Sequence, residues 1–516
     1  MSVQGATEEE NVQKGNHKDS STVLLGGKHD IVRRGRYEKE SIILRTHSGN
    51  RLYLFFLGNS KKDISEYSSV EILGVAFKHV FWVVLCSIPV VMLMSTIAFA
   101  YSKISFTNNC KENTTCSYYK SAVLLYGTNV SCAFIDSLKA VLVASCIVRD
   151  MVVLRKNMLK VMIPVFLLVL LLYSVLYYYS ISIWYYYIDV GITEALFFTT
   201  FTLSFYHISK YYDMSFLNIA KRFIFPILSG VLGIGFTEIY LSKKFAEASR
   251  YERYVIRLVI YPLLVDLILN FQEYGARQFL KTEHFTVHGL SHFVYVAQVA
   301  FGILGRYMTT TSGSLTNVAI VSGLIAVKDI IMHRACRFQC WLGYYLRRLF
   351  KLKDINDDHG TFEDWFYNED YRNFRSCILN NDFVHELITA FTVPMLVVSF
   401  RQHRALFNFD YDYLTDDAGN INMDFFFKQE AIQLLFLLFS FIAITYIEAR
   451  FNRLDLRILY RERDWLQEIS QFVIYIWGIY LCLSSVRLLP NYFQCTNNYI
   501  CHCNVDIDKK TRGCIG

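Results

Sequence analysis

Charge and proline are both scarce in this chain. Only 19% of its 516 residues are charged and only 6 are proline, whereas 53% are hydrophobic. A soluble protein of this length would spread its apolar residues over short amphipathic segments in two or three domains. Here the apolar residues come in long uncharged runs, and a soluble fold could not bury so many of them.

Recognisable catalytic signatures are also missing. The sequence contains no HExxH zinc-protease motif, no GxSxG elbow, no phosphate-binding glycine loop and no DDxxD cluster. We predict no metal ion, no cofactor and no nucleic-acid partner. A non-enzymatic function is therefore favoured over an enzymatic one.

What the chain has instead is a series of membrane-length segments. The run 161–190 carries no charge before Asp189, and about 20 apolar residues are enough to cross a bilayer. Similar runs recur along the chain, which predicts an all-α, polytopic transmembrane helix bundle with about eleven spans. The predicted spans are 74–100, 121–147, 161–188, 192–209, 219–241, 254–272, 287–305, 312–332, 383–400, 429–449 and 467–487.

Basic residues beside the spans set the predicted orientation, because cytosolic loops are enriched in Lys and Arg. The segment before the first span and the loops 149–160, 333–382 and 450–466 are the most basic, and all fall on one side. The N-terminus is therefore predicted to be cytosolic and the C-terminus lumenal or extracellular. One segment, 242–253, departs from this pattern. It places four basic residues on the predicted outer side: Lys243, Lys244, Arg250 and Arg253.

The spans divide the chain into six predicted parts. They are a disordered cytosolic N-terminus (1–37), a basic cytosolic segment with a β-hairpin (38–70), spans one to eight (71–332), a cytosolic loop with a basic and an acidic half (333–382), spans nine to eleven (383–488) and a Cys-rich external tail (489–516).

The predicted external segments hold six cysteines, which indicates disulfides formed in an oxidising compartment. Asn113 begins an Asn-Thr-Thr acceptor for N-glycosylation. Both features predict a eukaryotic membrane protein of the secretory pathway, in the endoplasmic reticulum, Golgi or plasma membrane. The disulfide candidates are Cys110, Cys116, Cys495, Cys501, Cys503 and Cys514.

Two cytosolic regions carry basic residues suited to the anionic headgroups of membrane lipids. The loop 333–382 also offers a surface for a protein partner, since its basic half is followed by an acidic, aromatic half. The basic residues in question are Arg347, Arg348, Lys351, Arg450, Arg453, Arg457 and Arg461.

Ionisable residues inside the spans are the main functional signal, because a charge in the bilayer is costly. Asp136 and Lys139 share a helix face and predict either a structural ion pair or the gate of a transport path. Glu238 and Asp266 are candidates for the rest of that path. The fifth span also contains Pro226 and three glycines, typical of an interrupted helix at a substrate site or of close helix packing.

Three histidines repeat every four residues: His284, His288 and His292. A helix would place all three on one face. The outer two would lie about 12 Å apart along the axis, too far to share one metal ion. We therefore predict a polar stripe at the cytosolic mouth of the seventh span, facing neighbouring helices or headgroup water.

The segment VHGLSHF, with His288 and Gly289 in an apolar span, resembles the histidine region of membrane-bound O-acyltransferases. That family uses a membrane-embedded histidine with an upstream asparagine. The resemblance implies His288 as general base and Asn270 as its partner. The tryptophan-rich surroundings of the family are missing at both places.

Three functions remain open from the sequence. Transport of an ion or small solute is favoured, because several ionisable residues lie within spans. The alternatives are an acyltransferase-like enzyme using His288, and a non-catalytic receptor, scaffold or assembly factor that acts through its loops.

Overall fold

A computed structural model describes residues 67–103, 118–178, 185–280, 282, 284–310, 314–349, 361–399, 422–456 and 465–485. All regular secondary structure in these ranges is helical, as the sequence predicts. The helices are α3 (Ser69–Lys103), α4 (Tyr118–Val148), α5 (Met151–Asn157), η2 (Met158–Met162), α6 (Ile163–Tyr178), α7 (Tyr185–Tyr211), α8 (Phe216–Phe236), η3 (Thr237–Leu241), α9 (Ser242–Glu247), α10 (Arg250–Val255), η4 (Ile256–Ile260), α11 (Tyr261–Arg277), α12 (Val287–Thr310), α13 (Leu315–Leu349), α14 (Phe362–Phe366), α15 (Glu369–Ser399), α16 (Met423–Asn452) and α18 (Trp465–Ser485).

Within the described ranges, nine helical segments are long and apolar enough to cross a membrane. They correspond to nine of the eleven predicted spans. The other two predicted spans, 192–209 and 467–487, fall on α7 and α18, which are helical but are not among the nine. An integral membrane protein built from helices is thus supported, in agreement with the composition.

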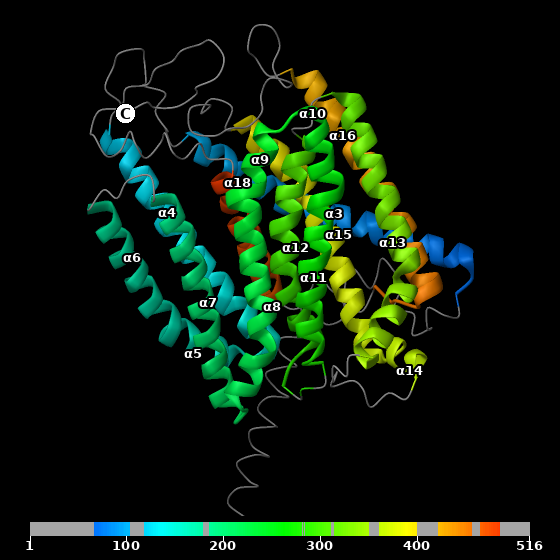
Figure 1. The fold of residues 1–516 in the computed structure, drawn as a ribbon, viewed down its shortest axis with the longest axis horizontal. Helices are drawn as coiled ribbons and strands as arrows, with labels where there is room; N and C mark the ends of the chain where they lie inside the picture. The colour runs from blue at the N-terminus through cyan, green and yellow to red at the C-terminus, as the bar shows by residue number, and fades with distance from the viewer. Residues whose placement is uncertain are drawn as a thin grey trace, which may run out of the picture. The chain divides into compact units, whose positions relative to one another are not determined.

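Helix α12 is the central element of the bundle (Figure 1). Nearly all of its residues are buried, from His288 to Thr310. It packs against α15 along most of its length, and against α4, α11 and α18 on its other sides. A helix buried all round has no lipid face, so its polar side chains must find partners inside the protein.

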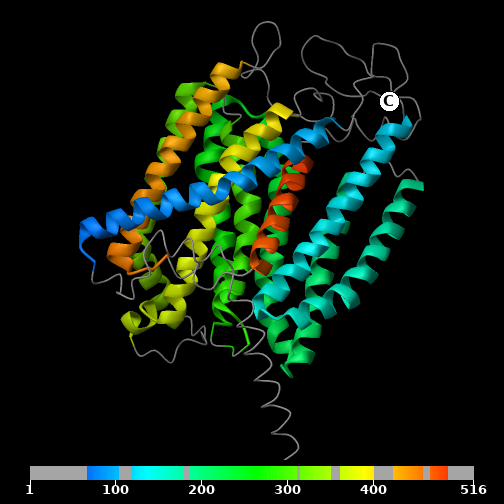
Figure 2. The same cartoon turned by 180° about the vertical axis from the view of Figure 1, so that it is seen from behind.

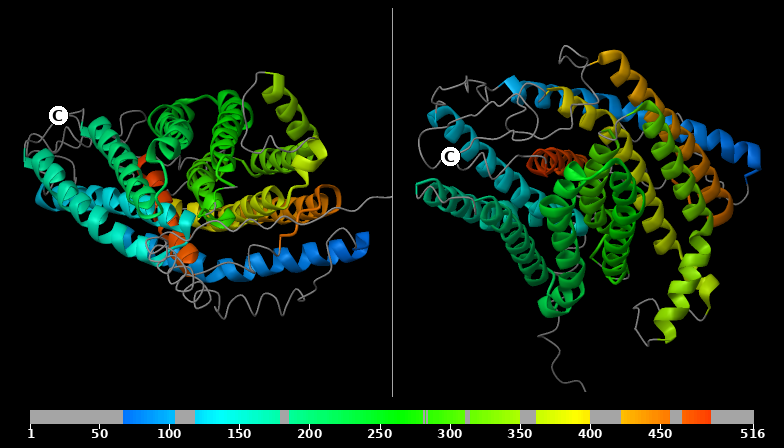
Figure 3. Two further views of the ribbon diagram at one scale, coloured as in Figure 1. Left: turned by 90° about the horizontal axis from the view of Figure 1, so that it is seen from below. Right: turned by 45° about the horizontal axis from the view of Figure 1, so that its top comes forward.

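One group of helices, α4 to α7, lies on one side of this centre, with α18 packed against both α4 and α12 (Figure 3). On the other side α13 packs against α16. Helix α3 runs obliquely across α15 and α16, as the view from behind makes plain (Figure 2). The bundle therefore has an interior lined by α12 and α15 and a periphery with exposed apolar residues suited to lipid.

Close approach of α12 to α4 depends on Gly289. A Cβ atom built there would lie 2.1 Å from the carbonyl oxygen of Cys146 and 2.4 Å from Cα of Ile147. Just before α12, the Thr286 amide donates to the Ile147 carbonyl at 2.8 Å. The His288-Gly289 pair noted in the sequence thus has a packing role, since only glycine lets the two backbones meet.

The fifth predicted span shows close packing rather than a break. Helix α8 continues through Pro226, whose ring lies against the Gly275 backbone of α11. On the same interface, Gly230 lies against Gln272. Of the two explanations for the Pro/Gly pattern, the packing one fits. A π-helical turn, η3, follows and carries the buried Glu238.

Several predicted boundaries are corrected by the structure. The ninth span was placed at 383–400, but α15 begins at Glu369, and α13 extends to Leu349, well past the predicted end of the eighth span. The predicted loop 333–382 is thus largely helical, with α14 between them. Polar residues such as Asn380 and Asp382 obscured the start of α15 because hydropathy scores them against a span.

Some predictions fall outside the described residues. These are the N-terminal segment 1–37, the β-hairpin within 38–70, the tail 489–516, the glycosylation acceptor Asn113 and all six disulfide candidates. Six cysteines of the described ranges form no disulfide: Cys86, Cys132, Cys146, Cys336, Cys340 and Cys377. Of the basic residues predicted to meet lipid headgroups, Arg450 is exposed, and Arg453 ends α16 with a positive φ of 55° and lies over the Tyr367 ring.

Candidate functional site

A polar seam joins α12 and α15, which run in the same direction. From the start of each helix toward its end, four side-chain hydrogen bonds between described residues connect them. They are His288 Nδ1 with Cys377 Sγ at 3.0 Å, Ser291 Oγ with Asn381 Nδ2 at 3.3 Å, Gln298 Nε2 with Asp382 Oδ1 at 3.4 Å, and Arg306 Nη2 with Glu386 Oε2 at 2.6 Å. The seam passes from neutral pairs at one end to an ion pair at the other.

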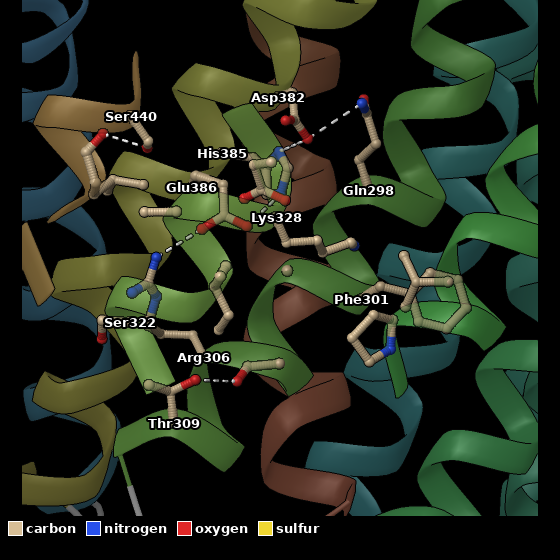
Figure 4. A pocket seen from close by; sticks show the side chains of 18 of the residues that line it. Gln298, Phe301, Arg306, Thr309, Ser322, Lys328, Asp382, His385, Glu386 and Ser440 are labelled. Carbon is tan, nitrogen blue, oxygen red and sulfur yellow. Dashed lines mark hydrogen bonds and ion pairs between the residues drawn. The ribbon is translucent and has the colours of Figure 1, made fainter. Parts of the chain in front are cut away.

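The charged end of the seam opens into a cavity of about 280 Å³, which we call the central cavity (Figure 4). Residues of η4, α11, α12, α13, α15 and α16 line it. Its charged members are Arg257, Arg306 and Lys328, and Asp266, Asp329, Asp382 and Glu386. With four carboxylates and three cations, it holds more charged side chains than the other cavities of the described bundle.

Arg306 anchors the cavity wall. Its guanidinium pairs with Glu386 and also donates to Gln433 Oε1 of α16 at 3.0 Å. The Arg306 side chain is only 10% exposed, whereas the Glu386 side chain is 32% exposed. The Glu386 carboxylate is therefore accessible from the cavity, and its ion pair with the more buried Arg306 fixes its position.

Asp382 and His385 lie next to this pair on α15. His385 Nδ1 is 3.6 Å from Asp382 Oδ1, and its Nε2 is 3.7 Å from Glu386 Oε1. The His385 ring packs directly against Gly302 of α12, where a side chain would not fit: a Cβ there would lie 2.5 Å from the ring. Asp382 is 38% exposed, so it too faces the cavity rather than the packed core.

A second ion pair lies across the cavity. Lys328 Nζ of α13 is 3.4 Å from Asp266 Oδ2 of α11, and both side chains are about one third exposed. Asp266 is one of the predicted path residues, and the structure places it in the cavity wall. At this exposure the pair contributes little to stability, about 0–1 kcal/mol.

Two polar atoms of the lining have no protein partner among the described residues. Both atoms are buried. Gln298 Oε1 accepts no hydrogen bond from a described residue, and Ser322 Oγ neither donates nor accepts one. Both side chains border the cavity in Figure 4. Buried polar atoms are nearly always satisfied, so these two are suited to bind water or a polar solute.

The other predicted path residues form a separate cluster. Lys139 Nζ is 2.5 Å from Asp136 Oδ1, and both side chains are almost fully buried. The ammonium lies over the rings of Trp477, at 3.2 Å from the centroid, and Phe197, at 4.3 Å. Aromatic faces therefore close this pair off on two sides.

Two further carboxylates belong to this cluster. Glu194 of α7 interacts electrostatically with Asp136, Lys139 and the buried Glu238 of η3. Asp136 Oδ2 has no hydrogen-bond partner among the described residues. Glu194 thus interacts with both the Asp136–Lys139 pair and Glu238, and none of these four residues lines the central cavity.

The three histidines of the 281–293 segment contact three different parts of the protein. His284 precedes α12 and stacks on Tyr212 with 4.5 Å between ring centroids. His288 contacts Cys377, and His292 Nε2 lies 3.3 Å from the Gln467 carbonyl of α18. The expected stripe facing neighbouring helices is found for His288 and His292. The one-face arrangement was wrong for His284, because the helix starts after it.

The acyltransferase resemblance finds no matching pair. Asn270 is exposed on α11, and its amide donates to the Asp266 carbonyl of its own helix at 2.6 Å. His288 is buried, with Cys377 at its Nδ1. None of the three cavities described in the bundle is lined by His288.

Sequence reasoning missed the residues that line the charged end of the seam. Arg306 and Asp382 fell just outside the predicted spans 287–305 and 383–400. The spacing of Asp382, His385 and Glu386 was the available signal, since positions i, i+3 and i+4 share one helix face. Arg257 lay inside the predicted sixth span and was a further signal.

No group of three or more His, Cys, Asp or Glu side chains suited to a metal ion is found in the described part of the chain. Comparisons with protein-family models, with curated proteins and with solved structures find no match. The geometry of the bundle interior is therefore the basis for assigning a function.

Proposed function

We propose that this protein moves an ion or small solute across a membrane through the central cavity of its helix bundle. One observation carries the proposal: seven charged side chains line a cavity of about 280 Å³ between helices long and apolar enough to span a membrane. Placing so many charges there is costly, and such residues are typical of substrate and ion pathways.

The proposed path uses the partly exposed carboxylates of the cavity. Asp266, Asp382 and Glu386 present oxygens to it, while Arg306 and Lys328 hold two of them in place. The unpartnered Gln298 Oε1 adds an uncharged acceptor. A polar solute that enters would exchange its water shell for these groups.

Asp136 and Lys139 retain the role that the sequence suggested, a gate or coupling pair, with Glu238 beside them. Support comes from the burial of this ion pair, which is costly inside a membrane bundle, and from the unpartnered Asp136 Oδ2.

The test is flux in reconstituted liposomes with a panel of labelled solutes. Glu386→Gln removes a cavity charge with little change in shape, and we expect flux to fall about ten-fold or more, the loss of one charged hydrogen bond. The matched control is Glu363→Gln. Its ion pair with Arg337 is half exposed and lies outside the cavity.

Equal flux in wild type, Glu386→Gln and Glu363→Gln would remove Glu386 from the path. Absence of flux for every solute in the panel, with folded protein in the membrane, would contradict transport itself.

A further inference from the structure

A second cavity, of about 270 Å³, lies at the end of the bundle where α9 and α10 meet the α12–α13 connection. We call it the vestibule. Its polar lining consists of Arg253, Arg257, Ser249, Ser314 and Asn317, together with Tyr254. Among the side chains that the structure describes, no acidic residue lines it. The vestibule is therefore positively charged, in contrast to the mixed charges of the central cavity.

Arg257 belongs to both cavities. Its Nε donates to Thr309 Oγ1 of α12 at 2.9 Å, and its guanidinium lies over the Tyr261 ring at 5.5 Å. Gly305 leaves room for that ring, because a Cβ there would lie 2.9 Å from Cε1 of Tyr261. The side chain thus stands where the vestibule meets the central cavity.

The charge of Arg257 is not neutralised by an ion pair with any described carboxylate. Glu386 and Asp329 act on it electrostatically, but Glu386 is already paired with Arg306. Arg306 thus has a carboxylate partner, whereas Arg257 has guanidinium N–H groups that are not used in an ion pair with a described carboxylate. A guanidinium presents a planar fork of N–H donors that matches carboxylate, phosphate and sulfate.

The acid nearest in sequence does not compete for this site. Glu252 is exposed, and its carboxylate accepts from the Ser249 backbone amide at 2.7 Å. Arg253, one helical turn before Arg257, is held by the Ala248 carbonyl at 3.1 Å and stays in the vestibule wall. Two arginines thus face the same small space.

We propose that the vestibule binds a small oxyanion, a carboxylate, phosphate or sulfate, with Arg257 as its main ligand. The carboxylates of the central cavity repel an anion, so the oxyanion is a ligand bound beside the proposed transport path and not the solute that passes along it. One of the four basic residues of the segment 242–253, Arg253, lines this site on the predicted outer side.

The binding test uses purified protein in lipid nanodiscs, titrated calorimetrically with succinate, inorganic phosphate and sulfate, and with choline and glucose as non-anionic probes. We expect saturable binding of at least one oxyanion and none of the two other probes. Arg257→Gln should weaken that binding about ten-fold or more, since it removes a charge-assisted hydrogen bond. Arg155→Gln, an exposed arginine that lines neither cavity, is the matched control.

A second pair of variants does not depend on Arg257 folding correctly. Ser249 precedes α10 and is exposed. Aspartate and asparagine both replace serine well at the start of a helix, so Ser249→Asp and Ser249→Asn differ mainly in charge. We expect the aspartate variant alone to weaken oxyanion binding, about two- to five-fold, as for a partly screened charge.

The outcomes separate this inference from the transport proposal. No oxyanion binding by the wild type, or binding unaffected by both Arg257→Gln and Ser249→Asp, would overturn the vestibule site, even if liposome flux of a neutral or cationic solute were found. Oxyanion binding that follows the expected pattern without flux of any solute would leave the vestibule as a binding site and overturn transport.

Discussion

The Asp136–Lys139 pair and the Asp424–Lys428 pair are nearly identical in geometry and opposite in environment. Both have an N–O distance of 2.5 Å within one helix. The first is almost fully buried, and the second is more than half exposed. The comparison separates the effect of burial from that of the ion pair itself.

Replacing Asp136 by Asn should leave the Lys139 ammonium buried without its carboxylate. Removing one partner of a buried pair costs about 3–5 kcal/mol, so the free energy of unfolding should fall by that order. Asp424→Asn should change it by about 1 kcal/mol or less. Chemical denaturation in detergent measures both.

Flux through the folded Asp136→Asn protein tests its second role. The proposed gate predicts reduced uptake per folded molecule. Full uptake of every transported solute would make the pair purely structural.

The closest contact of helix α12 with α4 requires a glycine at position 289. Gly289 touches the α4 backbone, where no side chain can move aside. Gly74 of α3, by contrast, has nothing within 4 Å of the place where its Cβ would be. The two glycines are therefore a matched pair for one substitution.

Gly289→Ala should destabilise the protein by about 1–3 kcal/mol, the usual cost of overpacking. Gly74→Ala should be neutral or stabilising by about 0.5–1 kcal/mol, because alanine favours the helix. Thermal unfolding in detergent compares them. Equal melting temperatures for the two variants would contradict the close α12–α4 contact.

Helix positions were largely predictable from the sequence, and helix ends were not. Each of the eleven long apolar runs in the sequence overlaps a helix of the structure, since about 20 apolar residues are needed to cross a bilayer. The start of α15 was missed because the part of the helix before the predicted span carries Asn381 and Asp382, which contact Ser291 and Gln298 of α12 rather than lipid. Their partners lie far away in the sequence, so a local hydropathy pattern cannot assign them.

The same reason explains which site residues were found. Asp136, Glu238 and Asp266 are isolated charges in apolar surroundings and were visible in the sequence. Arg306 and Glu386 sit near span ends, where a charge is ordinary. Only the packing of α12 against α15 brings them to 2.6 Å.

The predicted orientation of the molecule in the membrane can be tested at two exposed positions. Tyr251, in the basic segment 242–253, is 82% exposed, and Asp370 is exposed at the start of α15. The predicted topology places Tyr251 outside and Asp370 in the cytosol. A membrane-impermeant maleimide should label Tyr251→Cys in intact cells, and Asp370→Cys only after permeabilisation.

The wild type, with its native cysteines, sets the background of that labelling. The reverse pattern would invert the topology and place the vestibule at the cytosolic face.

The central claim is that solute passes through the charged cavity, and Ser322 tests it most directly. Its hydroxyl borders the cavity without a protein partner among the described residues, and Ser322→Cys changes little in size. In proteoliposomes, a water-soluble thiol reagent should modify this cysteine and abolish most of the flux, while leaving the treated wild type unaffected. Complete modification with undiminished flux, or a cysteine that no water-soluble reagent reaches, would contradict the account.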